Sequence, residues 1–133
     1  MTFALDGSAM IAFLRDEPGA EVVALLTDPS QTCFARAIIL CELFYDFRRA
    51  EGEGAALDAI QTLVGLRIVF REDMDSPFWQ EAGRVKADHR RVSLADCLCI
   101  ALARRLNGEV VTCDHHEFDP LVAAGVLTVR FIR

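Results

Sequence analysis

Short apolar runs alternate along the chain with longer segments in which apolar residues recur every three or four positions. The short runs predict four to five strands, at Thr2–Asp6, Thr32–Ala35 (a short one), Leu66–Phe70, Glu109–Cys113 and Leu127–Ile132. The longer segments predict helices at 9–15, Ala20–Thr27, Ala37–Arg49, Glu53–Val64, Ser76–Lys86, Ser93–Leu106 and Asp119–Ala124. Strands that alternate with helices are typical of an α/β fold with a mostly parallel sheet.

Capping residues indicate where several of these helices begin and end. Ser8 and Ser93 precede apolar helices, Ser76 stands before a first-turn proline, and Gly65 follows the fourth helix. The strand candidate Ile68–Phe70 is apolar at consecutive positions, as strands are when helices cover both faces of a sheet. The sequence therefore predicts a three-layer α/β/α sandwich, with a ligand site at the carboxyl ends of its strands.

The composition favours one domain. Of 133 residues, 53% are hydrophobic and 26% charged, so residues 1–133 are expected to form a single domain with a sizeable core. No apolar run approaches the ~20 residues of a membrane span, and the N-terminus lacks the features of a signal peptide. The five cysteines show no Cys-x-x-Cys spacing, which fits free thiols in a reducing compartment. We therefore expect a cytoplasmic protein without membrane contact.

The net charge of the chain limits the classes of function that fit the sequence. A net charge of −6 argues against a protein that coats nucleic acid, because such proteins are basic. An acidic protein can still act on nucleic acid when metal ions neutralise its acids locally.

Four carboxylates stand at positions that a core would not favour. Asp6 and Asp114 each follow an apolar strand, Asp96 lies in the first turn of an uncharged helix, and Glu42 lies in a helix that is apolar nearly all round. Each has a structural explanation when taken alone. Asp6 fits a turn, Asp96 a capping box, Asp114 a polar loop, and Glu42 a salt bridge to an arginine such as Arg36.

Taken together, the four acids indicate a metal site. Parallel strands end at one edge of a sheet, so Asp6 and Asp114 are expected to meet there, and the helices that carry Asp96 and Glu42 can border that edge. Clustered carboxylates repel one another, and Mg²⁺ or Mn²⁺ would relieve the repulsion. Two such ions can activate a water for attack on a phosphodiester, which points to phosphoryl chemistry on a nucleic acid.

The motifs that contain these acids resemble the PIN-domain family, specifically VapC-type toxins of VapBC toxin–antitoxin pairs. The matching segments, in the family's order across essentially the whole chain, are Leu5–Ala9, Cys41–Leu43, Ser93–Asp96 and Thr112–Phe118. The resemblance implies a metal-dependent endoribonuclease, the toxin of a type II system, in which Asp6, Glu42, Asp96 and Asp114 are the catalytic acids and hold Mg²⁺ or Mn²⁺. It also implies an RNA substrate, a homodimer, and a VapB-type antitoxin that blocks the site. Gly7 and Ile39 depart from the family's usual residues, and neither is expected to touch an acid, so activity is expected.

Further side chains are candidates for supporting roles. Ser8 and Thr112 are expected to orient a carboxylate, a bound water or a phosphate. Asp119 is an additional candidate acid. Either His115 or His116 can ligate a metal, although adjacent loop histidines are more often solvated. A basic run before Ser93 can contact RNA phosphates, or can simply be a solvated loop; it contains Lys86, His89, Arg90 and Arg91.

Three other functions compete with this interpretation. A PIN-fold binding module with weak or no catalysis would keep the fold and act through protein partners, but all four acids are present. A phospho-acceptor regulator needs a lysine after a late strand, and no lysine follows Lys86. A haloacid-dehalogenase-type phosphatase needs Asp-x-Asp or Asp-x-Thr after the first strand, which Asp6-Gly7-Ser8 does not supply.

Overall fold

The computed structural model describes residues 1–133 and contains five strands and seven helices. The strands are β1 (Thr2–Leu5), β2 (Thr32–Arg36), β3 (Val69–Arg71), β4 (Glu109–Thr112) and β5 (Val129–Phe131). The helices are α1 (Gly7–Leu14), α2 (Ala20–Leu26), α3 (Ile38–Glu51), α4 (Glu53–Gly65), α5 (Ser76–Asp88), α6 (Leu94–Leu106) and α7 (His115–Ala123). No helix is long and apolar enough to cross a membrane.

The strands form one parallel sheet in the order β3-β2-β1-β4-β5. The central strand β1 pairs Phe3 with Cys33 on one side and with Glu109 on the other. All five carboxyl ends therefore lie at the same edge, as predicted. From β1 the chain continues to β2 and β3 on one side, and it then returns to β4 and β5 on the other side of β1. Where the strand order reverses in this way, a crevice opens at the carboxyl edge of the sheet.

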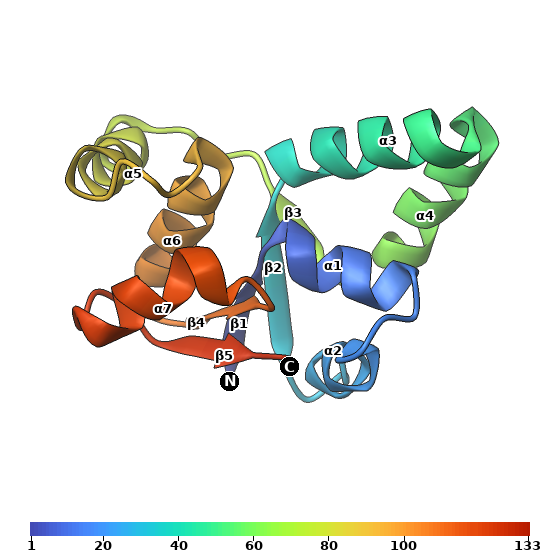
Figure 1. The fold of residues 1–133 in the computed structure, drawn as a ribbon, viewed down its shortest axis with the longest axis horizontal. Helices are drawn as coiled ribbons and strands as arrows, with labels where there is room; N and C mark the ends of the chain where they lie inside the picture. Colours follow the sequence, from blue (N-terminus) through green and yellow to red (C-terminus); the bar gives the residue numbers. More distant parts are fainter.

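Helices cover both faces of the sheet, which confirms the three-layer architecture (Figure 1). Successive β1 residues point to opposite faces: Phe3 and Leu5 join a core formed with α1, α2, α3 and α4, whereas Ala4 joins a second core formed with α5, α6 and α7. Between these helical layers, the carboxyl edge of the sheet remains accessible from one side.

Helix α6 is the most deeply buried helix. Every residue from Cys97 to Ala103 is buried, which agrees with the absence of charge in this segment. It packs against α5 and against β1, β2 and β4. The helix begins at the carboxyl edge of the sheet, so its first turn brings Asp96 there.

Two helix starts differ from the prediction because an aspartate one or two residues earlier is the cap. Asp6, and not Ser8, caps α1: its Oδ1 accepts the backbone N–H of Ala9 at 2.9 Å. Asp75, and not Ser76, caps α5 through Phe78 N at 3.1 Å. An ionised carboxylate is a stronger acceptor for helix N–H groups than a hydroxyl.

The fourth and seventh helices also have different limits. Gly65 lies inside α4, and the left-handed residue that follows this helix is Arg67, with φ 65°. Helix α7 begins at His115, four residues before the predicted start at Asp119, and contains Pro120. The side chain of Asp114 caps the helix and starts it earlier, so Pro120 lies inside the helix and not in its first turn.

Candidate active site

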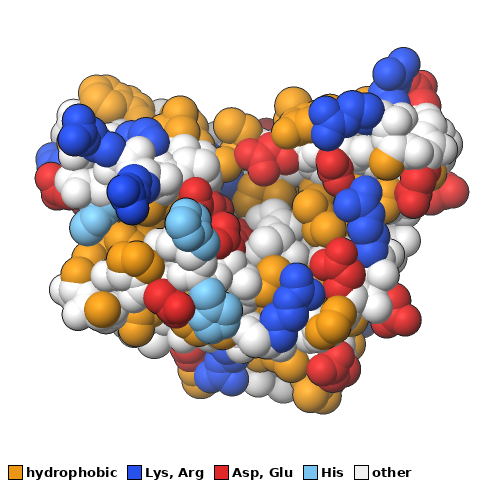
Figure 2. Space-filling model, viewed as in Figure 1, with side chains coloured by type: hydrophobic (Ala, Val, Ile, Leu, Met, Phe, Trp, Pro, Cys, Tyr) orange, Lys and Arg blue, Asp and Glu red, His pale blue; other side chains and the backbone are white.

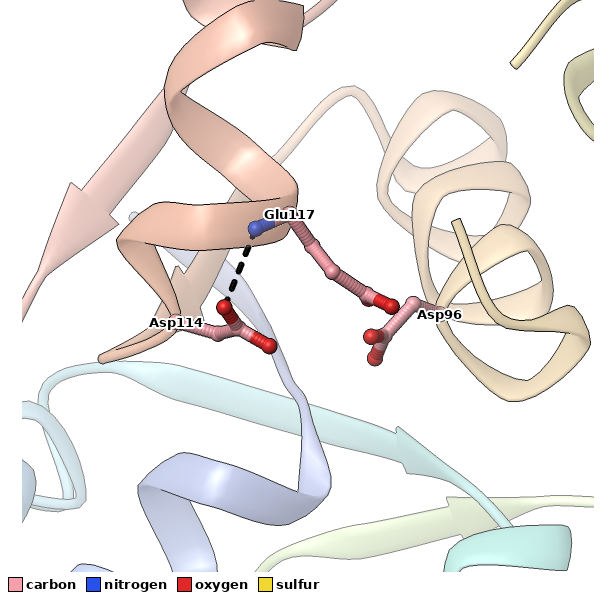
Figure 3. Close-up of side chains that lie close together, drawn as sticks. All are labelled: Asp96, Asp114 and Glu117. Atoms are coloured by element: carbon pink, nitrogen blue, oxygen red, sulfur yellow. Dashed lines mark hydrogen bonds between the residues drawn. The ribbon is translucent and has the colours of Figure 1, made fainter. Parts of the chain in front are cut away.

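Three carboxylates meet at the carboxyl edge of the sheet (Figure 3). Asp96 comes from the first turn of α6, Asp114 follows β4, and Glu117 comes from the first turn of α7. Each offers an oxygen that lies within 4.8 Å of the others. We call these three residues the acid cluster.

Asp6 lies beside the acid cluster and is only 1% exposed. Its Oδ1 accepts the Ser8 hydroxyl at 2.8 Å, and its Oδ2 accepts the Thr112 hydroxyl at 2.5 Å. Ser8 Oγ in turn accepts the N–H of Cys113, and Thr112 Oγ1 accepts the N–H of Asp114. The two hydroxyls therefore connect the end of β1 to the end of β4 and hold the Asp6 carboxylate in a fixed orientation.

The acids influence one another's protonation. Burial raises the pKa of Asp6 to about 6; the charge of Asp114 adds a smaller increase, and the hydrogen bonds from Thr112, Ala9 and Ser8 oppose it. Burial also raises the pKa of Asp96, with further increases from the adjacent Glu117 carboxyl group and from the charge of Asp6. These shifts indicate that the site carries more negative charge than its surroundings neutralise.

Glu42 lies near the cluster on the opposite helical layer. Burial raises its pKa, and the charge of Glu117 raises it further. Its Oε2 lies 3.6 Å from the position that a Cβ on Gly7 would occupy. The alternative pairing with Arg36 is wrong, because Arg36 instead forms an ion pair with Asp73 at 3.3 Å.

Sequence reasoning missed Glu117 as a site residue. The family-like segment Thr112–Phe118 contains this glutamate, but a helix expected to begin at Asp119 leaves it in the loop before that helix. Asp114-x-x-Glu117 has the same cap-and-acid spacing as Ser93-x-x-Asp96, so the pattern that identified Asp96 was also present here.

Glu117 also changes the role of the predicted capping box on α6. The Ser93 hydroxyl accepts the N–H of Asp96 at 3.2 Å, as expected. In a complete box, Asp96 would accept the Ser93 N–H in return. Glu117 Oε1 accepts that N–H instead, at 3.2 Å, so the Asp96 carboxylate is free of capping.

The predicted basic run divides into two parts. Lys86 donates its ammonium to the carbonyls of Arg90 at 2.9 Å and Val92 at 2.7 Å, and so braces the turn between α5 and α6. Arg90 and Arg91 are exposed and, with His89, line a cavity of about 550 Å³ that Glu117 also borders.

Asp119 and the first histidine lie outside the acid cluster. His115 Nδ1 lies 3.0 Å from Asp119 Oδ1, and its Nε2 lies 2.8 Å from the carbonyl of Arg133. The His115 ring also stacks on Phe131, with 3.9 Å between ring centroids. These contacts anchor α7 to β5 and leave both ring nitrogens engaged.

The residues of the acid cluster fit a divalent cation. No arginine or lysine forms an ion pair with Asp6, Glu42 or any member of the cluster. Glu117 Oε2 is buried and has no hydrogen-bond partner. A buried carboxylate oxygen without a donor requires a proton or a cation, and hard cations such as Mg²⁺ and Mn²⁺ prefer oxygen ligands.

Solved structures share this fold along nearly the whole chain. VapBC from Salmonella typhimurium, solved with DNA bound, has a TM-score of 0.76 at 20% identity and covers 100% of this chain and 99% of that chain. VapBC2 from Rickettsia felis, bound to a promoter DNA fragment, has a TM-score of 0.76 at 14% identity, with 98% of each chain covered. VapC20 from Mycobacterium tuberculosis, a sarcin–ricin loop cleaving toxin, has a TM-score of 0.71 at 18% identity, with 96% of this chain and 98% of that chain covered.

Comparison by sequence gives one family. No curated protein matches the chain significantly. The PIN domain matches residues 3–121, a span that contains β1 with Asp6, the α6 segment with Asp96, and the start of α7 with Asp114 and Glu117. With this match and the shared parallel sheet, the chain belongs to the PIN-domain family.

Proposed function

We propose that residues 1–133 form a single metal-dependent endoribonuclease domain, the toxin of a type II toxin–antitoxin pair. The observation that carries the proposal is the acid cluster, in which the buried Glu117 Oε2 has no partner and no arginine or lysine forms an ion pair with the carboxylates. The fold that it shares with a toxin that cleaves the sarcin–ricin loop supports RNA as the substrate.

Each acid has a role in this proposal. Asp96, Asp114 and Glu117 would hold a Mg²⁺ or Mn²⁺ ion, with Asp6 beside them and Glu42 at the opposite side of the site. A bound divalent ion activates water and stabilises the charge that develops on a phosphodiester. Ser8 and Thr112 orient Asp6, and Ser93 positions Glu117 by donating its N–H.

The test is cleavage of structured RNA with Mg²⁺ or Mn²⁺, with and without EDTA. EDTA should abolish cleavage, and products should carry a 5′-phosphate and a 3′-hydroxyl. Asp6→Asn, Asp96→Asn, Asp114→Asn and Glu117→Gln should each lower the rate roughly 10²-fold or more, the scale of losing one electrostatic stabiliser. Asp119→Asn is the matched control, because Asp119 is an exposed acid on α7 outside the cluster.

Two results would contradict the proposal. Cleavage that persists in EDTA would exclude a dependence on metal. Products that end in a 2′,3′-cyclic phosphate would show attack by the RNA 2′-hydroxyl and not by a metal-activated water. Normal RNA cleavage by the Glu117→Gln variant would remove this residue from the site.

The proposal includes a protein partner. Structures of the same fold include a toxin–antitoxin complex from Klebsiella pneumoniae. An antitoxin of the VapB type would present a lysine or arginine to the unpaired acids and pack an apolar segment on nearby helices. A groove of about 390 Å³ between α1, α3 and α4 offers such a surface, lined by Phe13, Leu14, Phe47 and Ala59 among others. We also propose a homodimer, as in the sequence-based expectation.

All five cysteines are free, which is consistent with the proposed cytoplasmic location.

The alternative function, a PIN-fold module that only binds partners, predicts that RNA is not cleaved under any metal condition. The assay above therefore separates the two.

A further inference from the structure

A cavity of about 550 Å³ opens beside the acid cluster and has no role in the chemistry proposed above. Its walls come from the turn between α5 and α6 and from α7, and Glu117 belongs both to the cavity and to the acid cluster. The cavity and the cluster are therefore neighbours. Figure 2 shows this part of the molecular face, with acidic side chains in the central hollow and basic and histidine side chains beside them. A volume in the range of roughly 300–1,000 Å³ is typical of small-ligand sites.

The cavity wall carries free positive charge. Ten of the thirteen arginines form ion pairs with carboxylates, and the three that do not are Arg67, Arg90 and Arg91. Two of these three are consecutive residues in the wall of this one cavity. In a chain of net charge −6, an adjacent pair of unneutralised guanidinium groups is suited to an anion, and the planar fork of arginine matches the geometry of phosphate.

The wall is also fixed in place before any ligand binds. Lys86 donates to the carbonyls of Arg90 and Val92 and thereby holds the backbone that carries the arginine pair. The rest of the cavity contains the exposed apolar side chain of Pro120 and the unengaged ring of His116, above the buried Leu121, with the exposed Asp88 as its other acid. One compartment thus combines phosphate-binding groups with an apolar surface, which matches the two parts of a nucleotide.

We propose that this cavity is a nucleotide subsite, which holds one RNA nucleotide on one side of the scissile bond. Arg90 and Arg91 bind backbone phosphate, and the base packs on Pro120 with His116 beside it. The subsite rests on the proposed function, because it requires the scissile phosphate to lie at the acid cluster. RNA is favoured over an acidic peptide because a peptide carboxylate would use the arginines and leave the apolar surface uncovered.

The first experiment measures binding without cleavage. Anisotropy of labelled single-stranded RNA is recorded against KCl concentration in the Asp114→Asn background. Arg90→Gln/Arg91→Gln should weaken binding roughly tenfold or more, and should reduce the slope of log K against log salt by about 1.4, or 0.7 for each lost phosphate contact. The control Arg49→Gln/Arg67→Gln removes the same charge from exposed arginines elsewhere, Arg67 lying before β3 at the opposite edge of the sheet.

The second experiment locates the subsite with RNA shortened from either end. The penalty of Arg90→Gln/Arg91→Gln should disappear when nucleotides are removed from one side of the cleavage point and should remain when they are removed from the other. In cleavage assays the double variant should raise KM and leave kcat within about twofold.

The outcomes distinguish the subsite from the proposed function. If the wild-type protein binds RNA through the arginine pair but does not cleave it, the cavity remains an RNA-binding site and the proposed nuclease activity is wrong. Cleavage with an unchanged KM in the double variant would overturn the subsite and leave the nuclease. If the arginine pair and its control variant lose the same RNA affinity, the effect is only general charge attraction, and the subsite proposal is wrong. The same conclusion follows if the loss of affinity is equal for every truncated RNA.

Discussion

At the scale of single residues, Asp6 and Glu117 are held by hydrogen bonds that they accept from hydroxyl and backbone N–H groups. Neither carboxylate forms an ion pair with an arginine or lysine. Asp6 accepts two hydroxyls and one backbone N–H, so its position is fixed although its burial disfavours ionisation. Glu117 caps α6 with one carboxylate oxygen and leaves the other without a partner. Buried carboxylates without a counter-charge lower the stability of the free protein, and a cation at the proposed metal site would offset that cost.

Asp6 gives a prediction about pH. Its pKa is raised from 3.8 to about 6, so between these values the folded protein binds a proton that the unfolded chain has lost. Stability of the metal-free protein should therefore fall as pH rises from about 4 to about 6 and stay lower above that range, by roughly 3 kcal/mol from this group. In EDTA, Asp6→Asn should be more stable than the wild type at pH 7.5, and this difference should shrink toward pH 4.

Thermal or urea unfolding across this pH range measures the effect. Asp119→Asn, an exposed carboxylate on α7, is the control and should show no comparable difference. If the free energies of unfolding of the wild type and Asp6→Asn differ by the same amount at every pH, the prediction is contradicted. Such a constant difference would come from a change in packing and not from the protonation of Asp6.

At the scale of elements, the turn between α5 and α6 depends on the only lysine of the chain. The chain contains one lysine and thirteen arginines. The compact ammonium of Lys86 donates hydrogen bonds to two carbonyls of one tight turn. The turn matters for function because it leads directly into Ser93 and Asp96 and carries Arg90 and Arg91.

Lys86→Met retains the apolar stem and removes both hydrogen bonds, so it should destabilise the protein by about 1–3 kcal/mol. Hydrogen exchange of residues 89–93 should accelerate more than that of the buried part of α6. Lys86→Arg is the conservative control, since a guanidinium retains donors at this position, and Arg84→Met removes an exposed cation of the same helix. Unchanged exchange in Lys86→Met would show that the turn is held by other contacts.

The elements also show how far the sequence alone leads. Periodicity correctly predicted the parallel sheet and its layers, because apolar spacing depends mainly on burial. Asp6 and Asp114 were expected at the sheet edge because each follows a parallel strand, and both lie there. The predicted start of the last helix at Asp119 is wrong because Asp114 caps α7 four residues earlier, and Glu117 then lies in the first turn. The role of Lys86 was not predictable, since it depends on the path of a turn that no periodicity describes.

At the scale of the whole molecule, the unpaired acids and the groove between α1, α3 and α4 concern the proposed antitoxin. Co-expression with the neighbouring reading frame should yield a complex in which RNA cleavage is suppressed. Ala55→Arg places a long charged side chain in the groove and should weaken this complex, whereas free Ala55→Arg protein should cleave RNA normally. Leu57→Arg is the control, an exposed apolar residue of α4 outside the groove.

Size-exclusion chromatography with activity measurement of each fraction checks this expectation. Purification from the native operon without any small partner, when both proteins are made, would count against the antitoxin. A complex that forms equally with Ala55→Arg would place the partner elsewhere on the molecule.

The parallel pairing of β1 with β4 has a consequence for synthesis of the chain. Asp6 is made almost first, but its Thr112 partner and the acids Asp114 and Glu117 come from the last part of the chain. At about 5–20 residues per second, translation separates Asp6 from Glu117 by on the order of 5–20 s. During that interval a nascent chain contains no complete acid cluster, and a chain that stops before β4 never forms one. The site of the proposed nuclease is therefore completed only after synthesis has passed Glu117.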